Sequence, residues 1–170
     1  MQYRRALHKG GCYFFTLVTH ERKPIFNHPD VVLLLRQTFK RVKRNYPFEI
    51  DAAVILPDHL HCIWTLPIND DDFSTRWRLI KSGFAKAYGQ PLPIWQNRFW
   101  EHLIRDERDY RQHLDYIHFN PVKHGYTQTP AQWLHSSFRK FVELGFYDED
   151  WGSEVNLPET VGNESMGLLN

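Results

Sequence analysis

Cysteine is almost absent from this chain. Its two cysteines, Cys12 and Cys62, give no disulfide framework and no thiolate cluster for zinc, and we expect both to be small buried side chains. Long apolar runs are also missing, because the longest, VVLLL at residues 31–35, is far shorter than the roughly 20 residues of a membrane span. The opening MQYRRALHKGG has no apolar signal-peptide core. We therefore expect a cytoplasmic protein with no membrane partner.

Aromatic and basic side chains are plentiful by contrast. With 42% apolar and 15% aromatic residues among 170, the chain can build one compact core. The formal net charge is only +1, yet residues 1–140 hold all 21 Lys and Arg against 13 of the 20 Asp and Glu. A basic body suits a polyanion such as nucleic acid, because neutralised phosphates release counterions. An ordinary solvated surface explains the charge equally well.

Strand and helix signals alternate along the chain. Aromatic and β-branched runs predict four strands, at residues 12–20, 48–57, 59–67 and 94–104. Apolar residues at helical spacing predict three helices, at residues 27–47, 70–89 and 106–125. Pro121 is expected to disturb or end the last helix. This order favours an α+β fold with helices packed on one antiparallel sheet.

The two ends of the chain differ in charge. We expect one domain at residues 1–145 and a weakly structured acidic tail at residues 146–170. The seven acids after residue 140 are interleaved with Phe146, Tyr147 and Trp151. Two interpretations stay open: the tail mimics DNA and covers a basic groove, or it is disordered and only aids solubility.

The segment PDHLHCIWTLP at residues 57–67 sets two histidines one residue apart in a strand. Side chains alternate along a strand, so His59 and His61 point to one face while Leu60 and Cys62 point to the other. Two imidazoles on one face can converge on a metal ion. The bare spacing is common, however, and two unrelated polar positions remain the other interpretation. A zinc hydrolase is disfavoured, because no third His, Cys or HExxH-type Glu lies nearby at helical spacing.

The segment HLDYIHFNPVKHG at residues 113–125 supplies a partner for the histidines. Tyr116 and Asn120 are four residues apart and share one face of the predicted helix. The Asn carbonyl oxygen can complete a site for Mg²⁺ or Mn²⁺ that leaves positions open to phosphate oxygens. Tyr116 is then the nucleophile, although a phenol of pKa near 10 needs a nearby cation or base. Tyr110 is a rival nucleophile that we expect to face the core.

Three segments taken together carry a family resemblance: LPDHLHCIW, FSTRWRLIK and RFWEHLIRDERDYRQHLDYIHFNPVKHG. They resemble the REP-associated tyrosine transposases, IS200-like single-tyrosine transposases of the HUH endonuclease superfamily, over about residues 3–150. The resemblance implies a ferredoxin-like fold, a divalent metal bound by His59, His61 and Asn120, and attack on DNA by Tyr116. It also implies single-stranded DNA beside REP-type hairpins as the substrate, cleaved to a 5′-phosphotyrosine and a 3′-hydroxyl that can be rejoined. Many relatives have Asn where Asp58 stands.

Basic side chains elsewhere are candidates for DNA contact. The best candidates are Arg4 and Arg5 on an N-terminal arm, Arg76, Arg78, Lys81 and Lys86 beside Trp77, and Lys123 after Pro121. Lys123 equally well caps the helix end. One of His102, His113, His118 and His124 is expected to orient a ligand or touch DNA. We expect a DNA-nicking and rejoining enzyme, monomeric or homodimeric; the alternative is a hairpin-binding protein without turnover.

Overall fold

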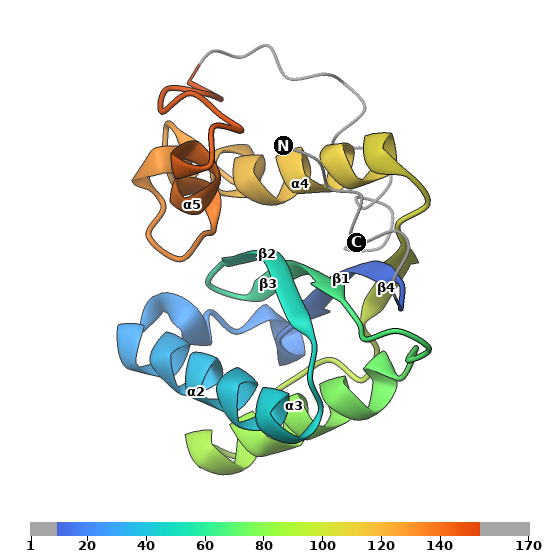
Figure 1. The fold of residues 1–170 in the computed structure, drawn as a ribbon. Helices are drawn as coiled ribbons and strands as arrows, with labels where there is room; N and C mark the ends of the chain where they lie inside the picture. The colour runs from blue at the N-terminus through green and yellow to red at the C-terminus, as the bar shows by residue number, and fades with distance from the viewer. Residues whose placement is uncertain (1–9, 154–170) are drawn as a thin grey trace.

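The fold is a single antiparallel sheet covered by helices on both faces. The computed structural model describes residues 10–153. Its strands lie in the order β2-β3-β1-β4 and comprise β1 (Cys12–Val18), β2 (Glu49–Ile55), β3 (His59–Thr65) and β4 (Trp100–Leu103). Helices α2 (Pro29–Asn45) and α3 (Phe73–Tyr88) lie below the sheet in Figure 1, and α4 (Glu107–Lys123) and α5 (Phe138–Glu143) lie above it. The predicted α+β class and the predicted element order are confirmed.

The pleat of the central strands divides the core into two layers. On β3, Leu60 and Cys62 pack with Trp77 of α3, whereas Ile63 packs with Leu114 of α4. β1 alternates in the same way and pairs antiparallel with β3. Apolar packing on both faces therefore fixes the register of β3, since a slip of one residue would exchange the two layers.

Helix α4 carries the second half of the predicted site and ends in a defined cap. Pro121 lies in its last turn, and the helix continues for two more residues, to Lys123. Pro121 is therefore near the end of the helix but is not its last residue. The amide of Gly125 donates to the Val122 carbonyl and that of Tyr126 to the Pro121 carbonyl. Gly125 has φ +76°, which completes a Schellman cap. The helix tolerates Pro121 because only one hydrogen bond, to the carbonyl four residues earlier, is missing.

Two boundaries differ from the sequence prediction. The last strand covers only Trp100–Leu103, because Trp95 makes an isolated bridge with Thr19 and residues 96–99 leave the ladder. The beginning of the predicted tail is packed: Tyr147 is buried and its hydroxyl donates to Asp115 at 2.7 Å. Residues 154–170 lie outside the described range, and a domain boundary near residue 145 stays a prediction.

None of the helices in residues 10–153 is long and apolar enough to cross a lipid bilayer.

Candidate catalytic site

His59 and His61 lie on the face of β3 that is turned toward α4, as the strand alternation predicts. Their ring centroids are 5.0 Å apart, and both side chains are buried. Each ring has one nitrogen bonded and one without a partner. His59 Nδ1 bonds Asp58 Oδ1 at 2.6 Å and His61 Nδ1 bonds Thr16 Oγ1 at 2.7 Å, whereas both Nε2 atoms have no hydrogen-bond partner in the described chain.

These Nδ1 contacts orient the two imidazoles. Thr16 faces His61 across the β1–β3 ladder, so the sheet register itself places the hydroxyl. Arg22 Nη1 in turn donates to Asp58 Oδ2 at 3.0 Å. Burial raises the pKa of Asp58, but its bonds with His59 and Arg22 outweigh burial and lower the pKa to about 2. A hydrogen-bonded Nδ1 with an open Nε2 is the usual arrangement for a metal-binding histidine.

Arg22 reaches Asp58 from a strained backbone. Glu21 and Arg22 have φ of 53° and 52°, a left-handed conformation that side chains rarely adopt. Such residues cost on the order of 1–3 kcal/mol each and gather at functional sites. Here the left-handed backbone brings Arg22 to Asp58, the carboxylate that orients His59.

Tyr116 and Asn120 approach the histidines from α4. The Tyr116 ring lies 5.1 Å from that of His61, and the His124 ring lies 5.0 Å from that of His59. Asn120 is midway between Tyr116 and His124 on the same helix stripe and therefore faces the histidine pair. The Tyr116 hydroxyl and both polar atoms of the Asn120 side chain are buried and have no hydrogen-bond partner among residues 10–153.

These unpartnered atoms fit a divalent metal and a phosphate. Buried polar groups are normally hydrogen-bonded, so several buried polar atoms without partners in one place indicate a binding site for a ligand or ion. Burial, with the neighbouring His59, holds the pKa of His61 well below its usual value, so this ring is neutral and can bind a cation. Two imidazole nitrogens and one amide oxygen form a donor set for such an ion.

Lys123 lies beside the candidate nucleophile. Its ammonium is 4.8 Å from the centre of the Tyr116 ring. An ammonium over an aromatic ring at this distance makes a cation–π contact, which holds the two side chains together. The structure thus places Lys123 beside Tyr116, and its contact with DNA stays a prediction.

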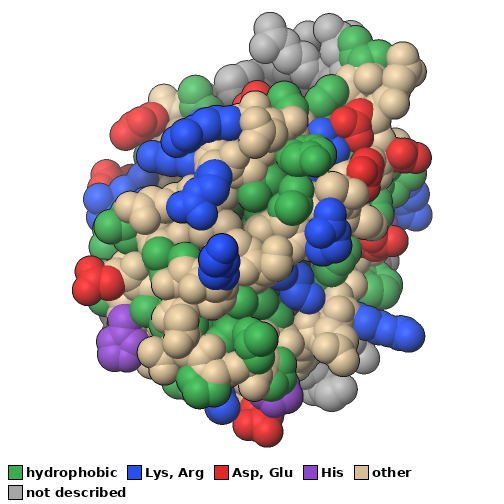
Figure 2. Space-filling view, turned by 90° about the horizontal axis from the view of Figure 1, so that it is seen from below, with side chains coloured by type: hydrophobic (Ala, Val, Ile, Leu, Met, Phe, Trp, Pro, Cys, Tyr) green, Lys and Arg blue, Asp and Glu red, His purple; other side chains and the backbone are tan. Residues whose placement is uncertain are grey.

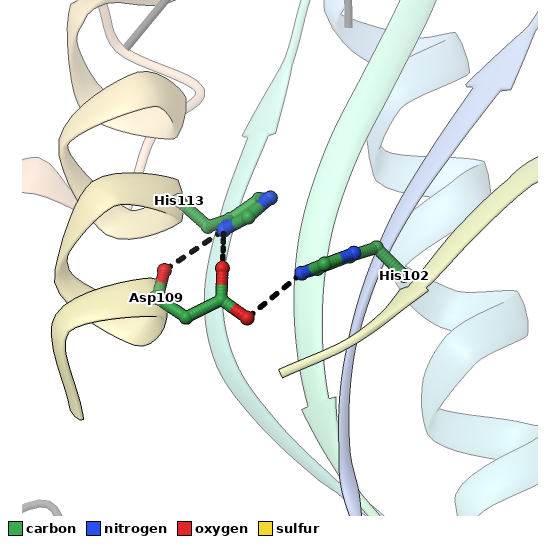
Figure 3. Close-up of side chains that lie close together, drawn as sticks. All are labelled: His102, Asp109 and His113. Carbon is green, nitrogen blue, oxygen red and sulfur yellow. Dashed lines mark hydrogen bonds and ion pairs between the residues drawn. The ribbon is translucent and has the colours of Figure 1, made fainter. Parts of the chain in front are cut away.

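A second group of ligand-type side chains joins β4 to α4. His102, Asp109 and His113 offer nitrogen and oxygen atoms within 4.8 Å of one another (Figure 3). However, the two imidazoles are stacked, 4.5 Å apart with an angle of 18° between them. An ion bound through a ring nitrogen must lie in the plane of that ring, and stacked planes do not converge on one point.

The group is better described as a hydrogen-bonded clamp. Asp109 accepts from His102 Nε2 at 2.8 Å and from the Arg105 amide at 2.9 Å, and His113 Nδ1 donates to the Asp109 carbonyl at 2.8 Å. Burial raises the pKa of Asp109, yet these donors bring it below the usual value. The His113 ring packs 4.7 Å from Phe14, which also contacts Tyr116. The clamp therefore fixes the helix that carries Tyr116.

One of the predicted DNA-contacting residues is structural. Arg76 is 2% exposed, and its guanidinium donates to Asp70 at 2.7 Å and to the carbonyls of Pro47 and Asp72 at 2.8 Å. All of its charge is used inside the protein, so the predicted DNA contact by Arg76 is wrong. The amphipathic helix pattern alone did not reveal that these acceptors surround it.

The other predicted basic residues are not gathered at the site. Arg78 and Lys86 are exposed on α3, on the opposite face of the sheet from Tyr116. Lys81 is half-buried and donates to the Gln96 carbonyl at 2.9 Å. Figure 2 shows Lys and Arg side chains spread over this α2–α3 face. Arg4 and Arg5 lie outside the described residues.

The remaining candidates divide between core and site. Tyr110 is 1% exposed and belongs to the core, as expected for the rival tyrosine. His118 is buried and bonds Tyr147 and Ser137. Of the four additional histidines, His124 is the one whose ring makes an edge-to-face contact with a site histidine, His59, in the described residues. The roles of Thr16 and Arg22 were not predicted from the sequence; an assumed β1–β3 register could have found Thr16.

Comparison with known proteins agrees with this geometry. The family described as Transposase IS200 like matches residues 9–105. The REP-associated tyrosine transposase of Escherichia coli (strain K12) is 49% identical over 154 residues, which cover 91% of this chain and 92% of the relative. A solved structure of a REP-associated tyrosine transposase bound to a REP hairpin has 48% identity and a TM-score of 0.80, covering 94% of this chain and 95% of that one. The chain therefore belongs to the IS200-like transposases, and within them to the REP-associated tyrosine transposases.

Proposed function

We propose that the protein is a metal-dependent endonuclease and transposase that nicks and rejoins single-stranded DNA next to REP-type hairpins. One observation carries the proposal: His59 and His61 on β3 and Tyr116 and Asn120 on α4 all have buried polar atoms without hydrogen-bond partners, and the rings of His61 and Tyr116 are 5.1 Å apart. The family relationship supports it, and so does a relative of 48% identity that is bound to a REP hairpin. All four residues lie within the predicted domain at residues 1–145. A cytoplasmic location and a monomeric or homodimeric state stay predictions.

His59 and His61, through Nε2, and Asn120, through its amide oxygen, would hold Mg²⁺ or Mn²⁺. When bound, the ion would withdraw electron density from the scissile phosphate and stabilise the negative charge of the transition state. Asp58 and Thr16 keep the two imidazoles in place by bonding their Nδ1 atoms. The protein thus supplies a rigid donor set on a strand buried on both faces.

Tyr116 supplies the nucleophile. Its phenolic oxygen forms a bond to phosphorus while the bond from phosphorus to the 3′-oxygen breaks, which leaves a 5′-phosphotyrosine and a 3′-hydroxyl. Solvent takes the phenol proton, and the departing 3′-oxygen gains one. Lys123, whose ammonium lies 4.8 Å from the centre of the Tyr116 ring, would place a positive charge beside the scissile phosphate. Rejoining is the same exchange in reverse, with a 3′-hydroxyl attacking the phosphotyrosine.

A covalent-adduct assay tests this function. Single-stranded oligonucleotides that carry a REP-type hairpin and its flanks are incubated with the protein and Mn²⁺ or Mg²⁺, and adducts are resolved on a denaturing gel. We expect an adduct that excess chelator abolishes. The double substitution His59→Ala and His61→Ala should abolish it as well, since the donor set is lost, while hairpin binding and the far-UV spectrum persist.

His28→Ala is the matched control, because His28 is exposed at the start of α2. Full adduct formation in chelator would contradict the metal requirement. Tight hairpin binding with no adduct under any ion would favour the alternative, a hairpin-binding protein without turnover.

A further inference from the structure

Aromatic rings lead from the histidine pair to the protein surface. The His124 ring lies 5.0 Å from that of His59 and 6.1 Å from that of Tyr126, and Tyr126 lies 5.4 Å from Trp133. The planes of the last two pairs differ by only 35° and 32°. The rings of His124, Tyr126 and Trp133 therefore form a series of moderately tilted faces, and its first member, His124, lies edge-on to the candidate metal ligand His59.

The backbone and hydrogen bonds hold these rings in place. The Schellman cap fixes the Tyr126 amide on the Pro121 carbonyl at 2.9 Å. The indole Nε1 of Trp133 donates to the Ile55 carbonyl of β2 at 3.0 Å. Between them, Gln132 Oε1 accepts from the amides of Gln128 and Thr129. A rigid aromatic side chain loses little entropy when a ligand stacks on it.

The series is open to solvent and lies beside positive charge. Tyr126 is 45% exposed, and His124 is exposed as well. Lys123 precedes them on the helix, with its ammonium 4.8 Å from the centre of the Tyr116 ring. Open aromatic faces next to cations are the surface that binds unpaired nucleotides, because every base has a π-face and every phosphate a charge.

We propose that His124, Tyr126 and Trp133 form a stacking platform for unpaired bases that adjoin the scissile phosphate. The inference rests on the proposed function, because the ligand is the DNA strand that enters the same site. Bases in a hairpin stem are paired and stacked on one another, so only the single-stranded flank can use the platform. Stacking tolerates any base, and the platform therefore adds affinity for a flank without fixing its sequence.

Equilibrium binding in chelator tests the platform apart from catalysis. Two oligonucleotides are compared by fluorescence anisotropy: a REP-type hairpin without flanks, and the same hairpin with single-stranded flanks carrying 2-aminopurine. For Tyr126→Ala we expect about a tenfold loss of affinity for the flanked hairpin, little change for the bare hairpin, and loss of the 2-aminopurine quenching seen with the unsubstituted protein. Tyr126→Phe keeps the ring and should bind within about twofold.

Tyr46→Ala is the matched control, since Tyr46 is 41% exposed at the end of α2, and it should bind both oligonucleotides normally. The inference is wrong if the unsubstituted protein binds the flanked and bare hairpins equally, or if folded Tyr126→Ala weakens both by the same factor. If binding depends on the flank and on Tyr126 but no covalent adduct forms, the platform is supported. The proposed nicking chemistry is then wrong.

Discussion

At the scale of single residues, burial decides what a charge can do. Arg76 is a cation in a basic helix, yet its guanidinium is enclosed by Asp70 and by the backbone carbonyls of Pro47 and Asp72. Removing the guanidinium would leave the Asp70 carboxylate and these carbonyls without their hydrogen-bond donor. Arg78, two residues later, points to solvent and has no comparable role.

We predict that Arg76→Gln lowers the free energy of unfolding by about 3 kcal/mol, whereas Arg78→Gln changes it by less than about 0.5 kcal/mol. Urea denaturation of both variants measures the difference. The folded fraction of Arg76→Gln should bind hairpin DNA as the unsubstituted protein does. Normal stability combined with weaker DNA binding would restore the DNA contact predicted from the sequence.

The sequence predicted the site residues unevenly, for physical reasons. The strand period of two is enough to place His59 and His61 on one face of the strand, and the helix period places Tyr116 and Asn120 on one face of the helix. Thr16 and Arg22 could not be found in this way, because their roles depend on sheet register and on two left-handed residues. The buried acceptors around Arg76 come from a turn and a helix end that the pattern of α3 does not encode.

At the scale of elements, β2 contains a register shift at which an ionisable carboxyl, that of Asp51, is largely buried. The β2–β3 register shifts between Ile50 and Ala52, and Asp51 at this bulge accepts a 2.6 Å hydrogen bond from Thr65. Burial raises the pKa of Asp51 to about 6. The folded protein thus holds this proton more tightly than the unfolded chain does. Ionisation of Asp51 therefore leaves the free energy of unfolding unchanged below about pH 4 and lowers it as pH rises through 6.

We predict that Asp51→Asn stabilises the protein at pH 7.5 by roughly 2 kcal/mol, because about 1.4 kcal/mol corresponds to each pKa unit and the amide accepts a weaker bond from Thr65. The gain should shrink at pH 4.5. Urea denaturation at both pH values measures it, with Glu101→Gln, an exposed carboxyl on β4, as the control. A gain of the same size at both pH values would show that ionisation of Asp51 is not its cause.

The elements themselves were largely predictable, and their ends were not. Periodicity located the central strands and the three long helices, whose apolar faces build two separate cores. The short β4 depends on where pairing with β1 stops, and the packing of Tyr147 depends on partners from α4. Such contacts between distant segments leave no periodic signal in the sequence.

At the scale of the whole molecule, the sheet separates two surfaces. The face formed by α2 and α3 carries many of the Lys and Arg side chains (Figure 2), while the candidate catalytic groups lie between the sheet and α4. Lys123 and Arg22 are the cations that the structure places beside the catalytic groups in the described residues. The proposed chemistry depends on a few side chains held by α4 and β3, and foremost on the hydroxyl of Tyr116.

The most direct test of that dependence is a covalent-adduct assay on the variant Tyr116→Phe. With Mn²⁺ and a flanked REP-type hairpin, we predict that Tyr116→Phe gives no adduct and binds the hairpin within a few-fold of the unsubstituted protein, since only the nucleophilic hydroxyl is gone. Tyr110→Phe, the buried tyrosine of the same helix, should form the adduct normally. Peptide mapping of the adduct by mass spectrometry should place the DNA on Tyr116. An adduct that persists in Tyr116→Phe would contradict the assignment and move the nucleophile to another residue.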